Sequence, residues 1–130
     1  MITRSASCSC GQLTAAAQGD PVRVSVCHCL SCQRRTGGAF SAQARFRRAD
    51  VEIRGRATAY VRTGDSGKKA TFHFCGHCGA TVYYELESQE GIVAIPLGAF
   101  ADPSFPPPRI SVYEEYKHPW VDVRCDEHMA

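Results

Sequence analysis

Cysteine is the residue type that points most directly to chemistry in this sequence. The chain has eight cysteines, and seven occur in three short clusters: Cys8-Ser9-Cys10, Cys27-His28-Cys29-Leu30-Ser31-Cys32 and Cys75-Gly76-His77-Cys78. Cysteines separated by one or two residues can present their sulfurs to one metal ion from a single tight turn, and zinc sites are commonly built from two such turns. The spacing therefore predicts metal sites rather than a disulfide framework.

The spacing allows two ways of dividing the cysteines between metal ions. In the first, one four-cysteine site resembling a zinc ribbon uses Cys29, Cys32, Cys75 and Cys78, and the unused cysteines are Cys8, Cys10, Cys27 and Cys125. In the second, Cys8 and Cys10 join Cys75 and Cys78 in one site, and a second ion is held by Cys27, Cys29 and Cys32. Both divisions respect zinc-ligand spacing. The second is favoured because it uses seven cysteines and leaves no close pair without a role.

In the favoured division, the second ion has only three protein ligands. A zinc ion with four thiolates is coordinatively full and mainly supports folding, whereas three thiolates leave a position for water or substrate. Because zinc accepts a soft ligand and lowers the pKa of a bound thiol, the open position suits a thiol substrate. Alternatively a further residue closes the site, and the candidates are Cys125, His73, His77 and His128. His28 points away from the ion if its segment is extended, which favours a supporting or surface role.

Composition and charge limit the class of protein. With 130 residues, 44% hydrophobic and 22% charged, the chain is expected to form one domain over residues 1–130. The net charge is only +2 and the basic residues are scattered, which argues against nucleic-acid binding. No stretch resembles a membrane span or a secretory signal. We therefore expect a cytoplasmic protein without membrane association, whose cysteines stay reduced.

Motifs of several other enzyme classes do not occur in the sequence. A zinc deaminase needs H-x-E before P-C-x-x-C, and a zinc protease needs H-E-x-x-H. The usual nucleotide-binding glycine motifs and the G-x-S-x-G motif of hydrolases are also missing from the sequence. The cysteine clusters therefore remain the main guide to function.

The segments between the cysteines have the pattern of short strands. Alternating, β-branched and aromatic residues predict strands over residues 12–18, 23–27, 40–46, 57–62, 70–74 and 81–86. Phe72 and Phe74 alternate with Thr71 and His73, so one face of their strand is expected to enter the core. Turn-forming residues separate the runs, and only residues 30–35 suggest a helical turn. The sequence predicts a mainly β fold with little helix.

The cysteine motifs resemble those of a known family, the glutathione-dependent formaldehyde-activating (GFA) family. The similar runs are Cys8-Ser9-Cys10-Gly11, Cys27-His28-Cys29-Leu30-Ser31-Cys32-Gln33-Arg34-Arg35-Thr36-Gly37 and Phe72-His73-Phe74-Cys75-Gly76-His77-Cys78-Gly79, with weaker similarity at Pro108-Arg109-Ile110 and Pro119-Trp120. The resemblance implies a β-tent of short antiparallel strands with zinc-binding turns. It also implies two zinc ions per chain: a structural one on Cys8, Cys10, Cys75 and Cys78, and one at the active site on Cys27, Cys29 and Cys32.

The same resemblance implies a zinc-dependent carbon–sulfur lyase. In the family's reaction, glutathione and formaldehyde condense to S-hydroxymethylglutathione, or that adduct or a related thiol conjugate is cleaved. Zinc would hold the sulfur or polarise the aldehyde oxygen. The small thiol substrate, such as glutathione, would be the main partner. The alternatives are a non-catalytic zinc- and thiol-binding module and a structural or interaction domain.

Residues outside the cysteine motifs give weaker indications. Arg34 and Arg35 are candidates for binding the carboxylates of glutathione, with a solvated surface role as the alternative. The candidates for lining a pocket are Phe40, Tyr83, Tyr84 and Trp120, although aromatic residues of β proteins more often belong to the core. Cys125 lies in a polar segment and is interpreted as an incidental free thiol.

Overall fold

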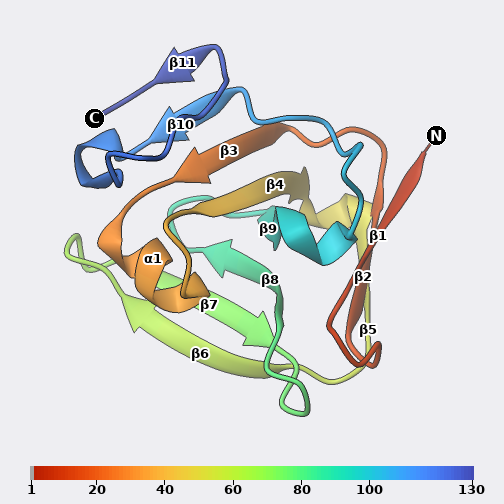
Figure 1. Ribbon diagram of the computed structural model, residues 1–130. Coiled ribbons are helices and arrows are strands. Elements are labelled where there is room, and N and C mark those ends of the chain that lie inside the picture. Colours follow the sequence, from red (N-terminus) through yellow and green to blue (C-terminus); the bar gives the residue numbers. More distant parts are fainter. Residues whose placement is uncertain (1) are drawn as a thin grey trace.

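Two β-sheets packed against each other form the structure, a computed structural model that describes residues 2–130 (Figure 1). The smaller sheet has the strand order β1–β2–β5 and comprises β1 (Thr3–Ser7), β2 (Thr14–Gln18) and β5 (Val51–Arg54). The larger sheet has the order β11–β10–β3–β4–β9–β8–β7–β6. Its strands are β3 (Arg23–Cys27), β4 (Ser41–Arg47), β6 (Thr58–Thr63), β7 (Lys69–Phe74), β8 (Thr81–Leu86), β9 (Ile92–Pro96), β10 (Ile110–Val112) and β11 (Glu127–His128).

The main core lies between the two sheets. The smaller sheet contributes small side chains, because Ala15 and Ala17 are fully buried and pair with β1 through Ala6 and Arg4. The larger sheet contributes bulkier ones: Phe46, Val82, Val93 and Ile95. A second cluster consists of Ala70, Phe72, Tyr84 and Ala94. Since successive strand residues point to opposite faces, the second cluster covers the other face of the larger sheet.

A short helix, α1 (Leu30–Thr36), follows β3 and begins inside the second cysteine cluster. Cys29 is its N-cap, and the Cys29 sulfur accepts a hydrogen bond from the Cys32 N–H at 3.4 Å. Gly37, with φ of 72°, ends the helix in a left-handed conformation. The remaining helical segments are the 3-10 turns η1 (Arg48–Asp50), η2 (Leu97–Phe100) and η3 (Glu114–Tyr116). The helix thus fixes the spacing of two cysteine sulfurs.

The predicted mainly β fold with little helix is confirmed. All six predicted strands occur with ends shifted by no more than two residues, and the predicted helical turn is α1. The expected core face of β7 is also present, since Phe72 is buried, although Phe74 is only half-buried. The strands that were not predicted are β1, β5, β9, β10 and β11. Two pairings differ from the antiparallel expectation: β10 runs parallel to both β3 and β11, and long connections link it to each.

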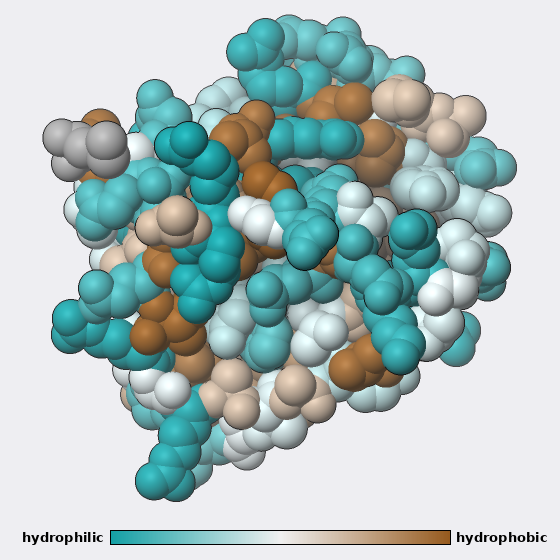
Figure 2. Space-filling model, turned by 180° about the vertical axis from the view of Figure 1, so that it is seen from behind, coloured by the Kyte–Doolittle hydropathy of each residue, from teal (hydrophilic) through white to brown (hydrophobic). Residues whose placement is uncertain are grey.

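The surface mixes hydrophilic and hydrophobic side chains. Seen from behind, hydrophobic residues emerge in separate patches between hydrophilic ones (Figure 2). Two aromatic side chains are among the most exposed, with Trp120 at 73% and Tyr60 at 60%. Among residues 2–130, no helix has the length and apolar character needed to cross a membrane.

Candidate metal centres and an adjoining pocket

Four cysteines from opposite sides of the core meet in one cluster, which we call the four-cysteine cluster: Cys8, Cys10, Cys75 and Cys78. Their sulfurs all lie within 4.8 Å of one another, and Cys10 Sγ is 3.6 Å from both Cys8 Sγ and Cys75 Sγ. Cys8 and Cys10 follow β1, whereas Cys75 and Cys78 follow β7. The cluster therefore connects the smaller sheet to the larger one.

Two similar turns present these four sulfurs. The Cys8 N–H donates to the Leu13 carbonyl at 2.9 Å, and the Cys75 N–H donates to the Ala80 carbonyl at the same distance. In each turn the hydrogen bond spans five residues and encloses the second cysteine of the pair. Gly79 adopts a φ of 83°, which a residue with a side chain rarely takes, and its N–H donates to the Cys75 carbonyl at 2.7 Å.

The Cys75 sulfur is surrounded by hydrogen-bond donors. Gln12 Nε2 lies 3.0 Å from Cys75 Sγ, and the N–H groups of His77 and Cys78 lie 3.3 and 3.4 Å from it. The Gln12 amide, followed by these backbone donors, lowers the pKa of Cys75 to about 6. The Gln12 N–H lowers the pKa of Cys10 too, but burial and the neighbouring thiols outweigh it and raise that pKa to about 11. Burial works against ionisation of Cys8, but the Leu13 N–H and the Cys10 and Cys78 thiols outweigh it and lower the pKa of Cys8 as well. Two sulfurs of the cluster, on Cys8 and Cys75, therefore favour the thiolate form, and ionisation of Cys10 is opposed.

A second group, the three-cysteine cluster, consists of Cys27, Cys29 and Cys32, whose sulfurs also lie within 4.8 Å of one another. Cys27 is the last residue of β3 and is buried, while Cys29 and Cys32 belong to the start of α1 and are half-buried. Among residues 2–130, no further cysteine, histidine or acidic side chain joins this group. The cysteines thus group as in the second of the two divisions that the spacing allows.

The three-cysteine cluster has the electrostatics of a cation site. A hydrogen bond from the Cys27 thiol, with smaller contributions that include Ser41 and the Arg35 guanidinium, lowers the pKa of Cys32 to about 5. In turn, the Cys32 sulfur and burial raise the pKa of Cys27. The Cys32 thiolate is thus stabilised by its neighbours, and its negative charge opposes ionisation of Cys27. A soft divalent cation would remove this opposition, so the donor sets of both clusters fit a metal ion such as zinc.

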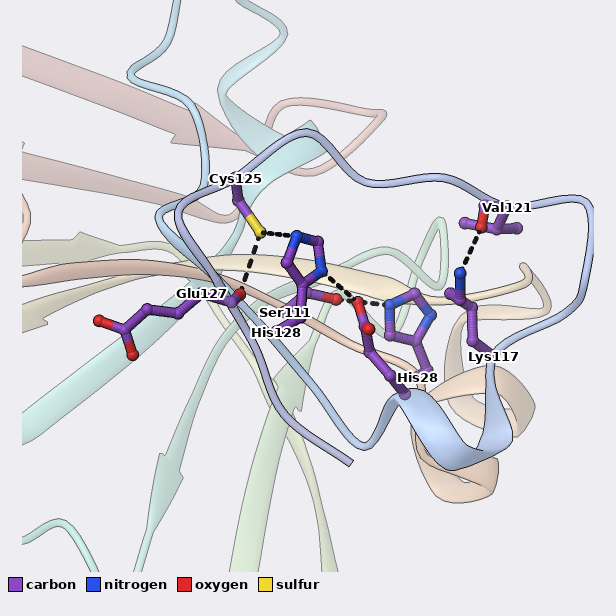
Figure 3. Close-up of polar contacts among 8 residues, drawn as sticks. His28, Ser111, Lys117, Val121, Cys125, Glu127 and His128 are labelled. Carbon is purple, nitrogen blue, oxygen red and sulfur yellow. Dashed lines mark hydrogen bonds and ion pairs between the residues drawn. The ribbon is translucent and has the colours of Figure 1, made fainter.

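His28 separates two cysteines of the three-cysteine cluster but is not part of it. Its ring is fully buried, and Nε2 lies 2.8 Å from Ser111 Oγ on β10 (Figure 3). Burial lowers the pKa of His28, which keeps the ring neutral at pH 7. The supporting role expected for His28 agrees with this position, and the surface role is wrong because β10 covers the ring.

The residues considered as a fourth ligand lie in other environments. Cys125 Sγ is 3.2 Å from the Glu127 carbonyl oxygen and 3.8 Å from His128 Nε2 (Figure 3). His73 stacks on Tyr83 with 4.2 Å between ring centroids, and its Nε2 lies 3.2 Å from Glu85 Oε1. Cys125, His128, His73 and the exposed His77 all lie outside the three-cysteine cluster.

A pocket of about 320 Å³ opens beside α1 and is lined by Ser31, Arg35, Tyr60, Arg62, Phe72, Phe74, Gly79 and Thr81. We call it the arginine pocket. Arg35 is the only residue of the sequence-based candidates for substrate binding that lines it, since Arg34 is exposed on α1. None of the four aromatic candidates lines the pocket: Phe40, Tyr83, Tyr84 and Trp120. Tyr84 is buried and Tyr83 is half-buried. Tyr60, Phe72 and Phe74 take that place instead.

Sequence reasoning missed several residues that support the clusters: Gln12, Ser41, Arg62 and Ser111. Gln12 contacts Cys75 across 63 positions of sequence, and Ser111 contacts His28 across 83. Gln12 directly follows the Cys8-Ser9-Cys10-Gly11 run, but nothing in the sequence assigns it a contact with Cys75, and no motif adjoins the other three residues. Only the pairing of β10 with β3, which sets Val112 opposite Cys27, brings Ser111 to this site.

A small, two-sheet β protein with two separate cysteine clusters is the class that the fold and the sites define. The sequence model of the family described as glutathione-dependent formaldehyde-activating enzyme (GFA) matches residues 3–116. This match covers most of the chain, so the chain belongs to that family. The family implies a role in glutathione-dependent formaldehyde activation, with glutathione and formaldehyde as small-molecule partners.

Comparison with solved structures supports the fold. A crystal structure of a Rhodobacter sphaeroides protein matches with a TM-score of 0.58 and 22% sequence identity, over 73% of this chain and 85% of that chain. At this identity the likeness concerns the fold alone. No curated protein matches the chain in sequence.

Proposed function

We propose that this chain is a zinc-dependent carbon–sulfur lyase that acts on a glutathione adduct. In the forward direction, the sulfur of glutathione forms a bond to the carbon of formaldehyde, and the thiol proton ends on the oxygen of S-hydroxymethylglutathione. The reverse reaction breaks the same bond, and a related thiol conjugate is a variant of the same chemistry. The observation that carries the proposal is the three-cysteine cluster, which gathers three sulfurs and no fourth protein ligand among residues 2–130, in a chain of this family.

The proposal assigns different roles to the two clusters. Cys8, Cys10, Cys75 and Cys78 would hold a structural zinc, because four thiolates fill a tetrahedral ion and join the two sheets. Cys27, Cys29 and Cys32 would hold a second zinc at the active site. When bound there, zinc would supply a Lewis acid that holds the substrate sulfur as a thiolate or polarises the aldehyde oxygen. A single domain over residues 1–130 and a cytoplasmic location, where thiols stay reduced, belong to the same proposal.

Side chains around the three-cysteine cluster would support this role. The Ser41 hydroxyl and the Arg35 guanidinium both favour the ionised form of Cys32. Cys29 and Cys32 are half-buried, so a small thiol can approach the cluster from solvent. Cys27 is buried at the end of β3 and would anchor the site to the larger sheet.

Native mass spectrometry of the zinc-loaded protein, titrated with glutathione, tests the proposal. We expect two zinc ions per chain and one glutathione adduct that is lost in Cys29→Ser, together with turnover of glutathione and formaldehyde in the unchanged protein. Cys125→Ser is the matched control, because Cys125 belongs to neither cluster. Two zinc ions with saturable glutathione binding and no turnover would instead indicate a binding module. Two ions that ignore glutathione would indicate a structural domain.

A further inference from the structure

The arginine pocket adjoins α1, the helix that begins within the three-cysteine cluster. Ser31, between Cys29 and Cys32, lines the pocket from α1, and Arg35 lines it one helical turn after Cys32. The opposite wall comes from β6 and β7, which lie next to α1 in Figure 1. The pocket and the three-cysteine cluster therefore share the first turn of α1.

Two guanidinium groups give this pocket a positive charge. The Arg35 and Arg62 guanidinium carbons lie 4.9 and 5.8 Å from the centroid of the same Phe72 ring. Arg62 Nη1 also donates to Ser31 Oγ at 3.0 Å, which ties β6 to α1. Neither arginine forms an ion pair with an acidic side chain in the part of the chain that the structure describes. Two half-buried, unpaired guanidinium groups on one ring favour an anionic ligand.

Apart from Ser31 and Thr81, the rest of the pocket is mainly apolar and aromatic. Its walls are formed by the rings of Tyr60, Phe72 and Phe74, and its volume of about 320 Å³ falls at the lower end of the range for small-molecule sites. Glutathione has two carboxylates that the arginines would attract, but its peptide part also carries amide groups that find few partners on the aromatic walls and an ammonium group that both arginines would repel. This pocket therefore suits the component that joins glutathione better than glutathione itself.

We propose that the arginine pocket binds an apolar, carboxylate-bearing group on the carbonyl component of the thiol conjugate, such as the ring of a carboxylated aromatic aldehyde. This inference rests on the proposed function for the position of the sulfur. The carboxylate pairs with Arg35 and Arg62, and the ring packs against Phe72 and the exposed Tyr60. The substrate class then extends from formaldehyde to conjugates of a thiol with much larger carbonyl compounds.

Binding of a probe without sulfur tests the pocket separately from the reaction. Ligand-observed NMR titrations of the zinc-loaded protein with benzoate, and with its neutral analogue benzamide, are expected to show benzoate binding about tenfold more tightly, the effect of a charge-assisted hydrogen bond. Arg62→Gln is expected to remove this preference. Arg34→Gln is the matched control, because Arg34 lies on α1 beside Arg35 but outside the pocket. Tyr60→Ala, at an exposed position, should weaken benzoate and benzamide alike.

The two levels of the proposal fail in different ways. Two results together support the pocket as a separate subsite. Cys29→Ser should still bind benzoate, and Arg62→Gln should lose benzoate binding while it still takes up glutathione. Equal binding of benzoate and benzamide, or no effect of both Arg62→Gln and Tyr60→Ala, overturns this inference and leaves the proposed lyase untouched. A kinetic comparison tests the substrate class. With glutathione as the thiol, the unchanged protein should turn over 4-formylbenzoate with a higher kcat/KM than benzaldehyde, and Arg62→Gln should abolish this difference. Equal kcat/KM values for the two aldehydes in the unchanged protein would contradict the substrate class.

Discussion

The ring of His28 and the hydroxyl of Ser111 form a buried hydrogen bond beneath the three-cysteine cluster, with 2.8 Å between Nε2 and Oγ. Ser111 is fully buried on β10, and β10 runs parallel to the strand that ends at Cys27. The other ring nitrogen of His28, Nδ1, has no hydrogen-bond partner within residues 2–130. The Ser111 contact is therefore the hydrogen bond that compensates the buried ring.

Removing this hydroxyl should weaken the fold. In Ser111→Ala, both ring nitrogens of His28 would be buried without partners, and the free energy of unfolding should fall by about 1–3 kcal/mol. Urea denaturation measures this loss, with Ser88→Ala as a control at an exposed position. An unchanged free energy of unfolding in Ser111→Ala would show that His28 finds another partner.

The two cysteine clusters should differ in their importance for stability. Cys75→Ser disturbs the cluster that joins the two sheets, and with zinc present we expect the free energy of unfolding to fall by about 4 kcal/mol or more, as for other lost metal sites. Cys32→Ser should cost less, because β3 and α1 are held by strand pairing and capping as well. Denaturation in zinc-containing buffer compares both variants with Cys125→Ser. Equal losses would mean that the three-cysteine cluster is structural too.

Metal uptake by the three-cysteine cluster should release protons. The pKa of Cys27 is raised, so its thiol is protonated at pH 7, whereas Cys32, with a pKa of about 5, is already ionised. Zinc binding must therefore displace at least the Cys27 proton. Between pH 8 and pH 6, each unit of acidification should lower the zinc affinity about tenfold for every proton released. A pH indicator added to metal-stripped protein measures the release. No release at pH 7 would contradict the assignment of Cys27 as a ligand.

Gly55 allows the close approach of β5 to the residue that supports Cys75. A Cβ at Gly55 would lie 1.9 Å from the Gln12 carbonyl oxygen, and the φ of 96° is itself unfavourable for other residues. Gly55→Ala should therefore cost more than the roughly 1–3 kcal/mol of backbone strain alone. Gly67→Ala is the matched control, with a φ of 85° and nothing within 4 Å of the added atom. Equal Tm values for the two variants would show that Gln12 moves freely.

The sequence predicted the features that depend on neighbours in the chain. Strands such as β3 and β8 follow from alternating or β-branched residues, and the short gaps between cysteines predict which sulfurs can share an ion. Strands β10 and β11 have only three and two residues, too short for a pattern to stand out. Strand β10 depends on long-range pairing with β3, and β11 depends on pairing with β10, neither of which a local signal carries.

The arginine pocket was only partly predictable for the same reason. Arg35 was a candidate, together with Arg34, because a guanidinium group can bind a carboxylate through paired hydrogen bonds. Arg62 reaches Ser31 across 31 positions of sequence, and that distance is closed only when β6 pairs with β7 and lies against α1. From the sequence, aromatic residues that line the pocket could not be distinguished from aromatic residues of the core, because both occur at alternating positions of strands.

The sequence distances within the two clusters also set an order of events while the chain is being synthesised. The sulfurs of the three-cysteine cluster come from six consecutive residues, so they are all available once residue 32 has left the ribosome. The four-cysteine cluster joins Cys10 to Cys75 across 65 positions and must wait for more than half of the chain. Strand β10, which buries His28, emerges later still. A nascent chain would thus expose the thiols of Cys8 and Cys10, together with those of the three-cysteine cluster, throughout the interval before its sheets can close.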